Sequence, residues 1–143
     1  MKKIIFALGV MLVATVQLGC KKEPSLTGTW NTTLAEVPVP VTVTINSDQS
    51  LKLHAAFNQP PLSLTMDGMG KYTLEGKELT IVLDKLDIGG LPDSMKSVIK
   101  PQLDKNLGKQ QHGTMEWKND NQFTLADGNG QVVNTFNRVV ATQ

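Results

Sequence analysis

Cysteine and histidine are almost absent from this sequence, and their scarcity excludes several kinds of site. Among 143 residues there is one cysteine, Cys20, and there are two histidines, His54 and His112. A single cysteine cannot form an internal disulfide, so packing alone must stabilise the fold. A zinc site takes three or four ligands, and nothing pairs these histidines at ligand spacing. We therefore expect solvated histidines and no metal site.

An excess of charge of one sign is lacking as well. The 14 Lys and Arg residues oppose 13 Asp and Glu residues, which gives a formal net charge of +1. A nearly neutral surface offers nucleic acid little electrostatic attraction, so we expect no nucleic-acid partner. No serine or threonine stands in a nucleophile elbow or beside a candidate base. The sequence thus predicts no catalytic residue, no cofactor and no enzymatic activity.

Apolar runs long enough to cross a membrane are missing too, but a shorter one lies near the start. Residues 4–16 carry no charge and follow Lys2 and Lys3. A spanning helix needs about 20 apolar residues, whereas a shorter run after a basic start is typical of a signal peptide. We expect residues 1–19 to be a signal peptide, the alternative being a buried core helix. Its removal leaves 12 basic and 13 acidic side chains, a net charge of −1.

The residues that end this segment resemble the lipobox of bacterial lipoproteins. Gly19 and Cys20 match the small residue and the lipidated cysteine of that pattern. Gln17 departs from it, because Leu18 stands one place later than the usual leucine. The resemblance implies that Cys20 receives a diacylglyceryl group and anchors the protein in a membrane of the cell envelope. Lys21 replaces the aspartate of an inner-membrane retention signal, which implies the outer membrane, facing the periplasm, in a two-membrane cell. A free or buried thiol is the alternative.

The rest of the chain has the pattern of one all-β domain. Residues 20–26 are polar and are expected to form a short tether, followed by a single domain over residues 27–143. Short apolar segments alternate there with turn signals about every ten residues, which is typical of a sandwich or a barrel. The first expected strand covers residues 26–34, and eight strands are expected in all.

The clearest strand lies within residues 37–45, where valine and isoleucine fill one face and threonine fills the other. This alternation of β-branched residues is typical of a half-buried strand. Pro38 and Pro40 cannot donate to a ladder, so the segment should begin at an edge or outside the ladder. Further along, Gly68 and Gly70 predict a bulge or a sharp bend.

Residues 91–107 break this rhythm between the fifth and sixth expected strands. Their apolar residues recur at steps of three and four, which predicts a helix. Pro92 suits the first helical position and Gly108 suits the residue just past the end. Pro101 predicts a kink or two short helices. The apolar stripe could be a plug that packs on one open end of the domain, or a lid over a cavity.

Gly28 and Trp30 near the start, together with Arg138 near the end, resemble the lipocalin and fatty-acid-binding barrels, the calycins. In that family an indole crosses the closed end and a basic side chain from the last strand lies over it. The resemblance implies a single eight-stranded antiparallel barrel with these three residues at its closure. There is no counterpart of the family's Thr-Asp-Tyr motif. The alternatives are a sandwich and a core tryptophan with an unrelated surface arginine.

Within such a barrel, a binding function is favoured over catalysis. The candidates for the inner face are bulky except for Ala55, which leaves room; they are Leu51, Leu53, Leu64 and Met66. An eight-stranded barrel either fills its interior or holds one small ligand. We expect a small apolar ligand, and the alternative is a filled barrel that docks on or inhibits another envelope protein. Residues 127–130 lack the terminal acid of a calcium loop and predict a tight hairpin instead.

Overall fold

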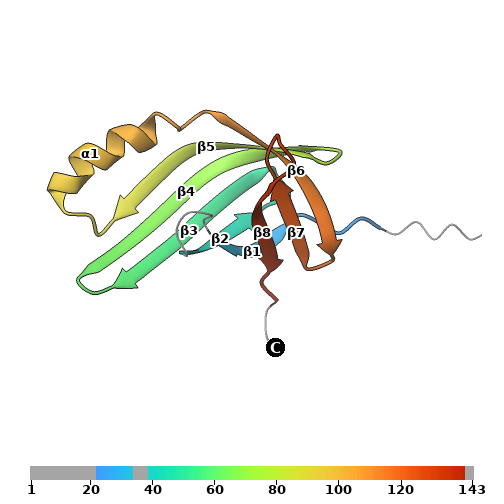
Figure 1. Cartoon of the computed structure of the whole chain (residues 1–143), viewed down its shortest axis with the longest axis horizontal. Coiled ribbons are helices and arrows are strands. Elements are labelled where there is room, and N and C mark those ends of the chain that lie inside the picture. The colour runs from blue at the N-terminus through green and yellow to red at the C-terminus, as the bar shows by residue number, and fades with distance from the viewer. Residues whose placement is uncertain (1–21, 34–38, 141–143) are drawn as a thin grey trace, which may run out of the picture.

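The computed structural model describes residues 22–33 and 39–140, and its strands form a closed antiparallel barrel. Each strand pairs with the next along the chain, and the last pairs with the first. The strands are β1 (Gly28–Thr33), β2 (Pro40–Ile45), β3 (Ser50–Gln59), β4 (Leu62–Glu75), β5 (Glu78–Gly89), β6 (Gln110–Asn119), β7 (Gln122–Ala126) and β8 (Val132–Arg138). One helix, α1 (Asp93–Asp104), lies between β5 and β6 (Figure 1). The prediction of an eight-stranded barrel with a helical insertion between the fifth and sixth strands is confirmed.

The β-branched alternation of the second strand places one face in the core. Val41, Val43 and Ile45 are buried, whereas Thr42 and Thr44 between them are half-buried. The strand begins at Pro40, which pairs with the last residue of β1, as expected for a residue that cannot donate to a ladder. The first strand is shorter than predicted, because β1 begins at Gly28 rather than at position 26.

Three adjacent strands, β3, β4 and β5, extend beyond the segments that pair with β2 and β6, and this difference opens one end of the barrel. β2 pairs with residues 51–55 of β3, and β6 pairs with residues 78–82 of β5. The remaining ends of β3, β4 and β5 project together as a three-stranded sheet, visible at the left of Figure 1. We call this the open end; the end from which the chain enters β1 is the closed end.

The bulge predicted near Gly68 and Gly70 is present where β4 pairs with β5. Gly70 lies opposite Leu83 and Met69 lies opposite Lys85, so Asp84 is an extra residue on β5. Because one residue is inserted, the alternation of inner and outer faces shifts by one beyond it. A side chain at Gly70 would clash with the backbone of β5, which explains the need for glycine there.

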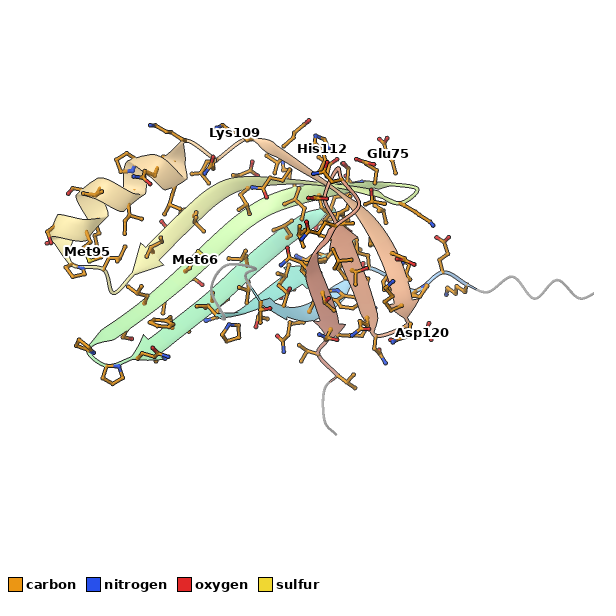
Figure 2. All side chains as sticks on the ribbon, viewed as in Figure 1. Met66, Glu75, Met95, Lys109, His112 and Asp120 are labelled. Atoms are coloured by element: carbon orange, nitrogen blue, oxygen red, sulfur yellow. The ribbon has the colours of Figure 1, made fainter. Side chains whose placement is uncertain are left out.

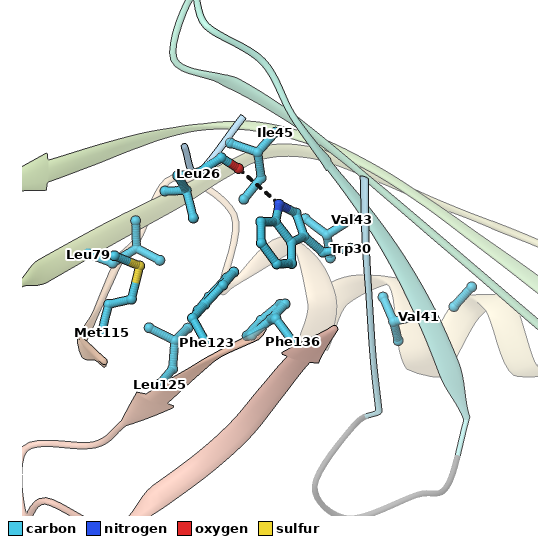
Figure 3. Packing of buried hydrophobic residues seen from close by; sticks show 11 residues of the cluster. Leu26, Trp30, Val41, Val43, Ile45, Leu79, Met115, Phe123, Leu125 and Phe136 are labelled. Atoms are coloured by element: carbon cyan, nitrogen blue, oxygen red, sulfur yellow. Dashed lines mark hydrogen bonds between the residues drawn. The ribbon is translucent and has the colours of Figure 1, made fainter. Parts of the chain in front are cut away.

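The core at the closed end contains four aromatic side chains in contact, of which Figure 3 shows Trp30, Phe123 and Phe136. Trp30 is fully buried, and the centroid of its ring lies 4.8 Å from that of Phe123 and 5.9 Å from that of Trp117. Phe136 stacks on Phe123 with centroids 4.6 Å apart and an interplanar angle of 6°. Edge-to-face and stacked pairs of this kind add about 0.5–1.5 kcal/mol each beyond the burial of their area.

The helix differs from its prediction in three respects. It spans Asp93–Asp104 and therefore begins one residue after Pro92, which is extended at ψ 146°. Two short helices do not form, because one helix continues through Pro101. No residue of the helix is buried, and Met95 and Val98 are 44% and 61% exposed. The interpretation of the helix as a plug with a buried stripe is therefore wrong.

The aromatic cluster generates a test of stability. Trp30→Ala should lower the free energy of unfolding by about 3–5 kcal/mol, because it removes the largest fully buried side chain and its ring contacts. Val139→Ala, at a half-exposed position near the same end, should change it by less than about 0.5 kcal/mol. Urea denaturation followed by circular dichroism measures both. Equal effects of the two substitutions on the free energy of unfolding would contradict a major contribution of the Trp30 indole to stability.

Candidate functional site

The three residues predicted to close the barrel lie together. The Cζ atom of Arg138 lies 4.2 Å from the centroid of the Trp30 ring, inside the distance of about 6 Å expected for a cation–π contact. Trp30 and Arg138 are also direct partners in the β1–β8 ladder. Gly28 has a φ of +144°, and a Cβ there would lie 2.6 Å from Nη1 of Arg138. Only glycine leaves room for the guanidinium at this place.

Arg138 also binds the chain that leads into the barrel. Its Nη1 donates to the Thr27 carbonyl at 3.0 Å, and its Nη2 donates to the Ser25 carbonyl at 2.5 Å. Its Nε donates to the carbonyl of Asp120 in the β6–β7 turn at 3.3 Å. Leu26 is buried in the core, and its carbonyl accepts a hydrogen bond from Nε1 of Trp30 at 2.9 Å. Ser25 and Leu26, which the sequence assigned to a tether, are thus held to the barrel by the bond from Arg138 and by the burial of Leu26.

The part played by Arg138 at the closed end can be measured. Arg138→Met keeps an apolar stem but removes the cation over the indole and three hydrogen bonds to carbonyls. We expect a loss of about 1–3 kcal/mol in unfolding free energy and faster amide exchange over residues 25–29. Lys118→Gln is the control, because it removes only an exposed ion pair with Glu116 at the same end. Unchanged exchange in Arg138→Met would show that other contacts hold the segment.

At the open end, residues of the three long strands, together with Val39 just before β2, line an apolar trough of about 270 Å³. Its lining residues are Val39, Ala55, Phe57, Leu64, Thr65, Met66 and Ile88. The ladder brings them together, because Ala55 lies opposite Met66 and Phe57 lies opposite Leu64. Ile88 lies opposite Met66 on the other side. Apart from Thr65, which is exposed, no side chain in this lining carries a polar group. We call this feature the trough.

Deeper in the barrel lies a second cavity of about 190 Å³. Its lining includes Leu53, Tyr72 and Ile81 on one side and Phe123 and Phe136 on the other. An apolar cavity of about 150 Å³ is large enough to hold benzene. The interior of this barrel is thus not completely filled, and the expected space beside Ala55 is present as the trough.

The helix lies beside the trough along β5. A third cavity, of about 150 Å³, separates α1 from β5, and Ile99 and Leu103 of the helix face Leu86 and Ile88 of the strand across it. Ile88 lines both this cavity and the trough. In Figure 2 the label of Met95 marks the helix at the far end of the molecule from Asp120. The helix borders the open end without sealing it.

The charged side chains of β3, β4 and β5 do not line the trough or the interior cavity, whereas Asp87 lines the third cavity, beside α1. His54 is exposed, as predicted, and its Nδ1 lies 2.7 Å from the carboxylate of Asp67 on the next strand. Lys85 contacts Asp87 at 2.8 Å, and the hydrogen bond and charge of that carboxylate raise the pKa of Lys85. Within residues 22–33 and 39–140, no three His, Cys, Asp or Glu side chains are grouped so as to hold a metal ion.

The predicted hairpin over residues 127–130 is confirmed. The carboxylate of Asp127 accepts hydrogen bonds from the backbone N–H groups of Asn129 and Gln131, both at 2.9 Å. Gly130 has a φ of +79°, which glycine adopts without strain. The acid that resembled a calcium ligand is thus used to cap its own turn.

Two predicted features remain outside the described residues, and several lining residues were not predicted. Cys20 and the signal peptide fall within residues 1–21. Among the described residues, no helix is both long enough and apolar enough to cross a membrane. Leu86 and Ile88 were missed because the bulge at Asp84 changes which residues face inward. The two-residue alternation seen separately on each side of Asp84 could have revealed them.

The strand order defines the class of protein: an eight-stranded up-and-down barrel, the architecture shared by lipocalins and streptavidin. No protein-family model matches the chain, and no curated protein matches it. Among solved structures, it is similar to a lipocalin-like protein from Bacteroides uniformis ATCC 8492, with 16% identity and a TM-score of 0.48. The match covers 80% of this chain and 98% of that one. A likeness at this level says nothing about ligand or activity.

Proposed function

We propose that the protein is a lipid-anchored envelope protein that binds one small apolar molecule in the trough without transforming it. The observation that carries this proposal is an apolar trough of about 270 Å³ at the open end of the barrel. Ligand sites usually have volumes of about 300–1,000 Å³ and apolar linings, so this one suits a small ligand. Ile88 also lines the cavity beside α1, so the helix borders the place of such a ligand.

The proposed anchor is the lipidated Cys20, and it would attach the barrel by its closed end. Arg138 holds Ser25, so only residues 20–25 would separate the lipid from the fold. That span measures at most about 18 Å when fully extended. Figure 2 places Asp120, next to this segment, at the opposite end of the molecule from Met95. The trough would therefore open away from the anchoring membrane.

Docking on another envelope protein is the second candidate. It is favoured by Met95 and Val98, which are exposed on α1, and by the part of β5 beyond residue 82, which pairs with no further strand among the described residues on its outer side. Exposed apolar residues beside an open sheet edge are typical of protein-binding surfaces. A trough that takes up no apolar probe would favour this candidate over ligand binding.

Binding in the trough is tested with the ε-methyl group of Met66 as the reporter. In the full chain with lipid nanodiscs, titration with octan-1-ol should shift the ¹³C-methyl resonance of Met66 saturably, because Met66 lines the trough. The exposed Met69 should respond far less. Leu64→Trp should weaken the apparent affinity about tenfold or more by filling the trough. The control is Leu74→Trp on the same strand, at an exposed position outside the trough.

Anchoring is tested separately by fractionation. Cys20→Ala removes the thiol that would carry the diacylglyceryl group, so the protein should leave the membrane fraction or retain its uncleaved signal peptide. Metabolic labelling with a fatty-acid analogue should label the parent chain and not the variant. Labelling of both chains, or of neither, would contradict lipidation at Cys20 while leaving the binding of a ligand untouched.

A further inference from the structure

The interior cavity is separate from the trough and has a different lining. Its volume is about 190 Å³, and none of the residues that line it lines the trough. Phe123 and Phe136, whose rings stack, form part of its wall at the closed end. Protein interiors contain few voids larger than a water molecule, and an apolar cavity of about 150 Å³ is already large enough for benzene. The interior cavity can therefore hold a molecule of its own.

Two side chains bring carboxamide groups to the lining of this cavity, Gln111 of β6 and Asn134 of β8. Both strands run toward the closed end, because Trp117 and Arg138 lie further along them. Gln111 and Asn134 therefore lie on the side of the cavity away from the closed end. Gln111 is also exposed to solvent, so the cavity meets the surface beside it.

The register of the strands places both carboxamides among apolar residues of the inner face. Gln111 lies opposite Ile81 on β5, and Ile81 lines the same cavity. Asn134 lies opposite Leu125 on β7, which also lines it. Directly opposite residues of neighbouring antiparallel strands share one face of the sheet. The cavity thus has aromatic rings toward the closed end and two polar groups on its other side.

The hydrogen bonds of these polar groups determine what a bound molecule must offer. Nδ2 of Asn134 donates to the Thr33 carbonyl at 2.9 Å, so the oxygen of this amide is left to accept a bond. The hydroxyl of Tyr72, which also lines the cavity, already donates to the Asn46 carbonyl at 2.9 Å. The carboxamide of Gln111 can both donate and accept. A hydroxyl group, which does both as well, can bind to either carboxamide.

We propose that the interior cavity is a second binding site, for a small uncharged aromatic molecule that carries a hydroxyl group. Its ring lies against Phe123 and Phe136, since aromatic rings favour edge-to-face and offset-stacked contacts. Its hydroxyl binds the carboxamides of Gln111 and Asn134. Among the described residues no charged side chain lines the cavity, so a charged ligand would find no counter-ion in this lining. The site goes beyond the proposed function, because the trough shares none of its lining residues.

The test compares phenol and toluene, two probes of equal heavy-atom count, on the full chain with lipid nanodiscs. Tyr72 is the one tyrosine of the chain and lines the cavity, so its ¹³C-labelled ring reports on this site. The methyl group of Met66 reports separately on the trough. Gln111→Met and Asn134→Leu each remove one carboxamide. Gln110→Met is the matched control, because Gln110 is the neighbouring glutamine of β6 and does not line the cavity. Partition of a probe into lipid is the same for every variant, so it cancels when variants are compared.

We expect both probes to shift the Tyr72 ring resonance saturably in the parent chain. Gln111→Met should weaken the binding of phenol about 3- to 10-fold, while the affinity for toluene stays within about twofold. Asn134→Leu also loses the bond to Thr33, so for this variant the ratio of the two affinities is compared, and it should fall by a similar factor. Gln110→Met should leave both affinities unchanged.

An unchanged ratio in either carboxamide variant, or an equal change in Gln110→Met, would overturn the inference. If Asn134→Leu does not fold, the ratio in Gln111→Met decides alone. No shift of the Tyr72 resonance with either probe would also overturn it and would show that the cavity holds only water. These outcomes leave the trough untouched, because the proposed function fails only if octan-1-ol does not shift the Met66 resonance.

Discussion

The indole of Trp30 lies where the first and last strands meet, and most of the fold depends on its burial. Its ring contacts Phe123 and Trp117 on one side and the guanidinium of Arg138 on the other. These contacts fill the closed end, so the barrel needs no disulfide there. Because β1 pairs with β8 at Trp30 and Arg138, the same residues remove the two edges that an open sheet would expose. Because packing at the closed end holds the barrel together, the open end does not need to be filled in the same way.

Much of this closed end could be predicted from the sequence, because the sequence patterns that mark it are either local or shared by the two ends of the chain. The valines of β2 alternate along the chain, and Gly28, Trp30 and Arg138 form a pattern at its two ends. The trough could not be predicted in the same way. One inserted residue at Asp84 reverses the inner and outer faces of β5 beyond it, and no propensity marks that position.

The helix shows a different limit of sequence reasoning. Its periodicity correctly indicates that Met95, Val98, Ile99 and Leu103 belong to a helical segment. Periodicity does not reveal which parts of the fold lie next to that segment. Of these four residues, only Ile99 and Leu103 face β5. Met95 and Val98 do not line the cavity beside β5, and they stay exposed.

The three hydrogen bonds of Arg138 also determine how the barrel would bear mechanical load. A pull on the chain before β1 would first reach Ser25 and Thr27, whose carbonyls Arg138 holds. From there the guanidinium passes the force to β8 and, through the Asp120 carbonyl, to the β6–β7 turn. The load is therefore shared by segments more than a hundred residues apart in sequence. The pairing of β1 with its neighbours would not be broken one residue at a time. Tension applied at the N-terminal side would leave the trough undistorted until the hydrogen bonds of Arg138 to Ser25 and Thr27 break.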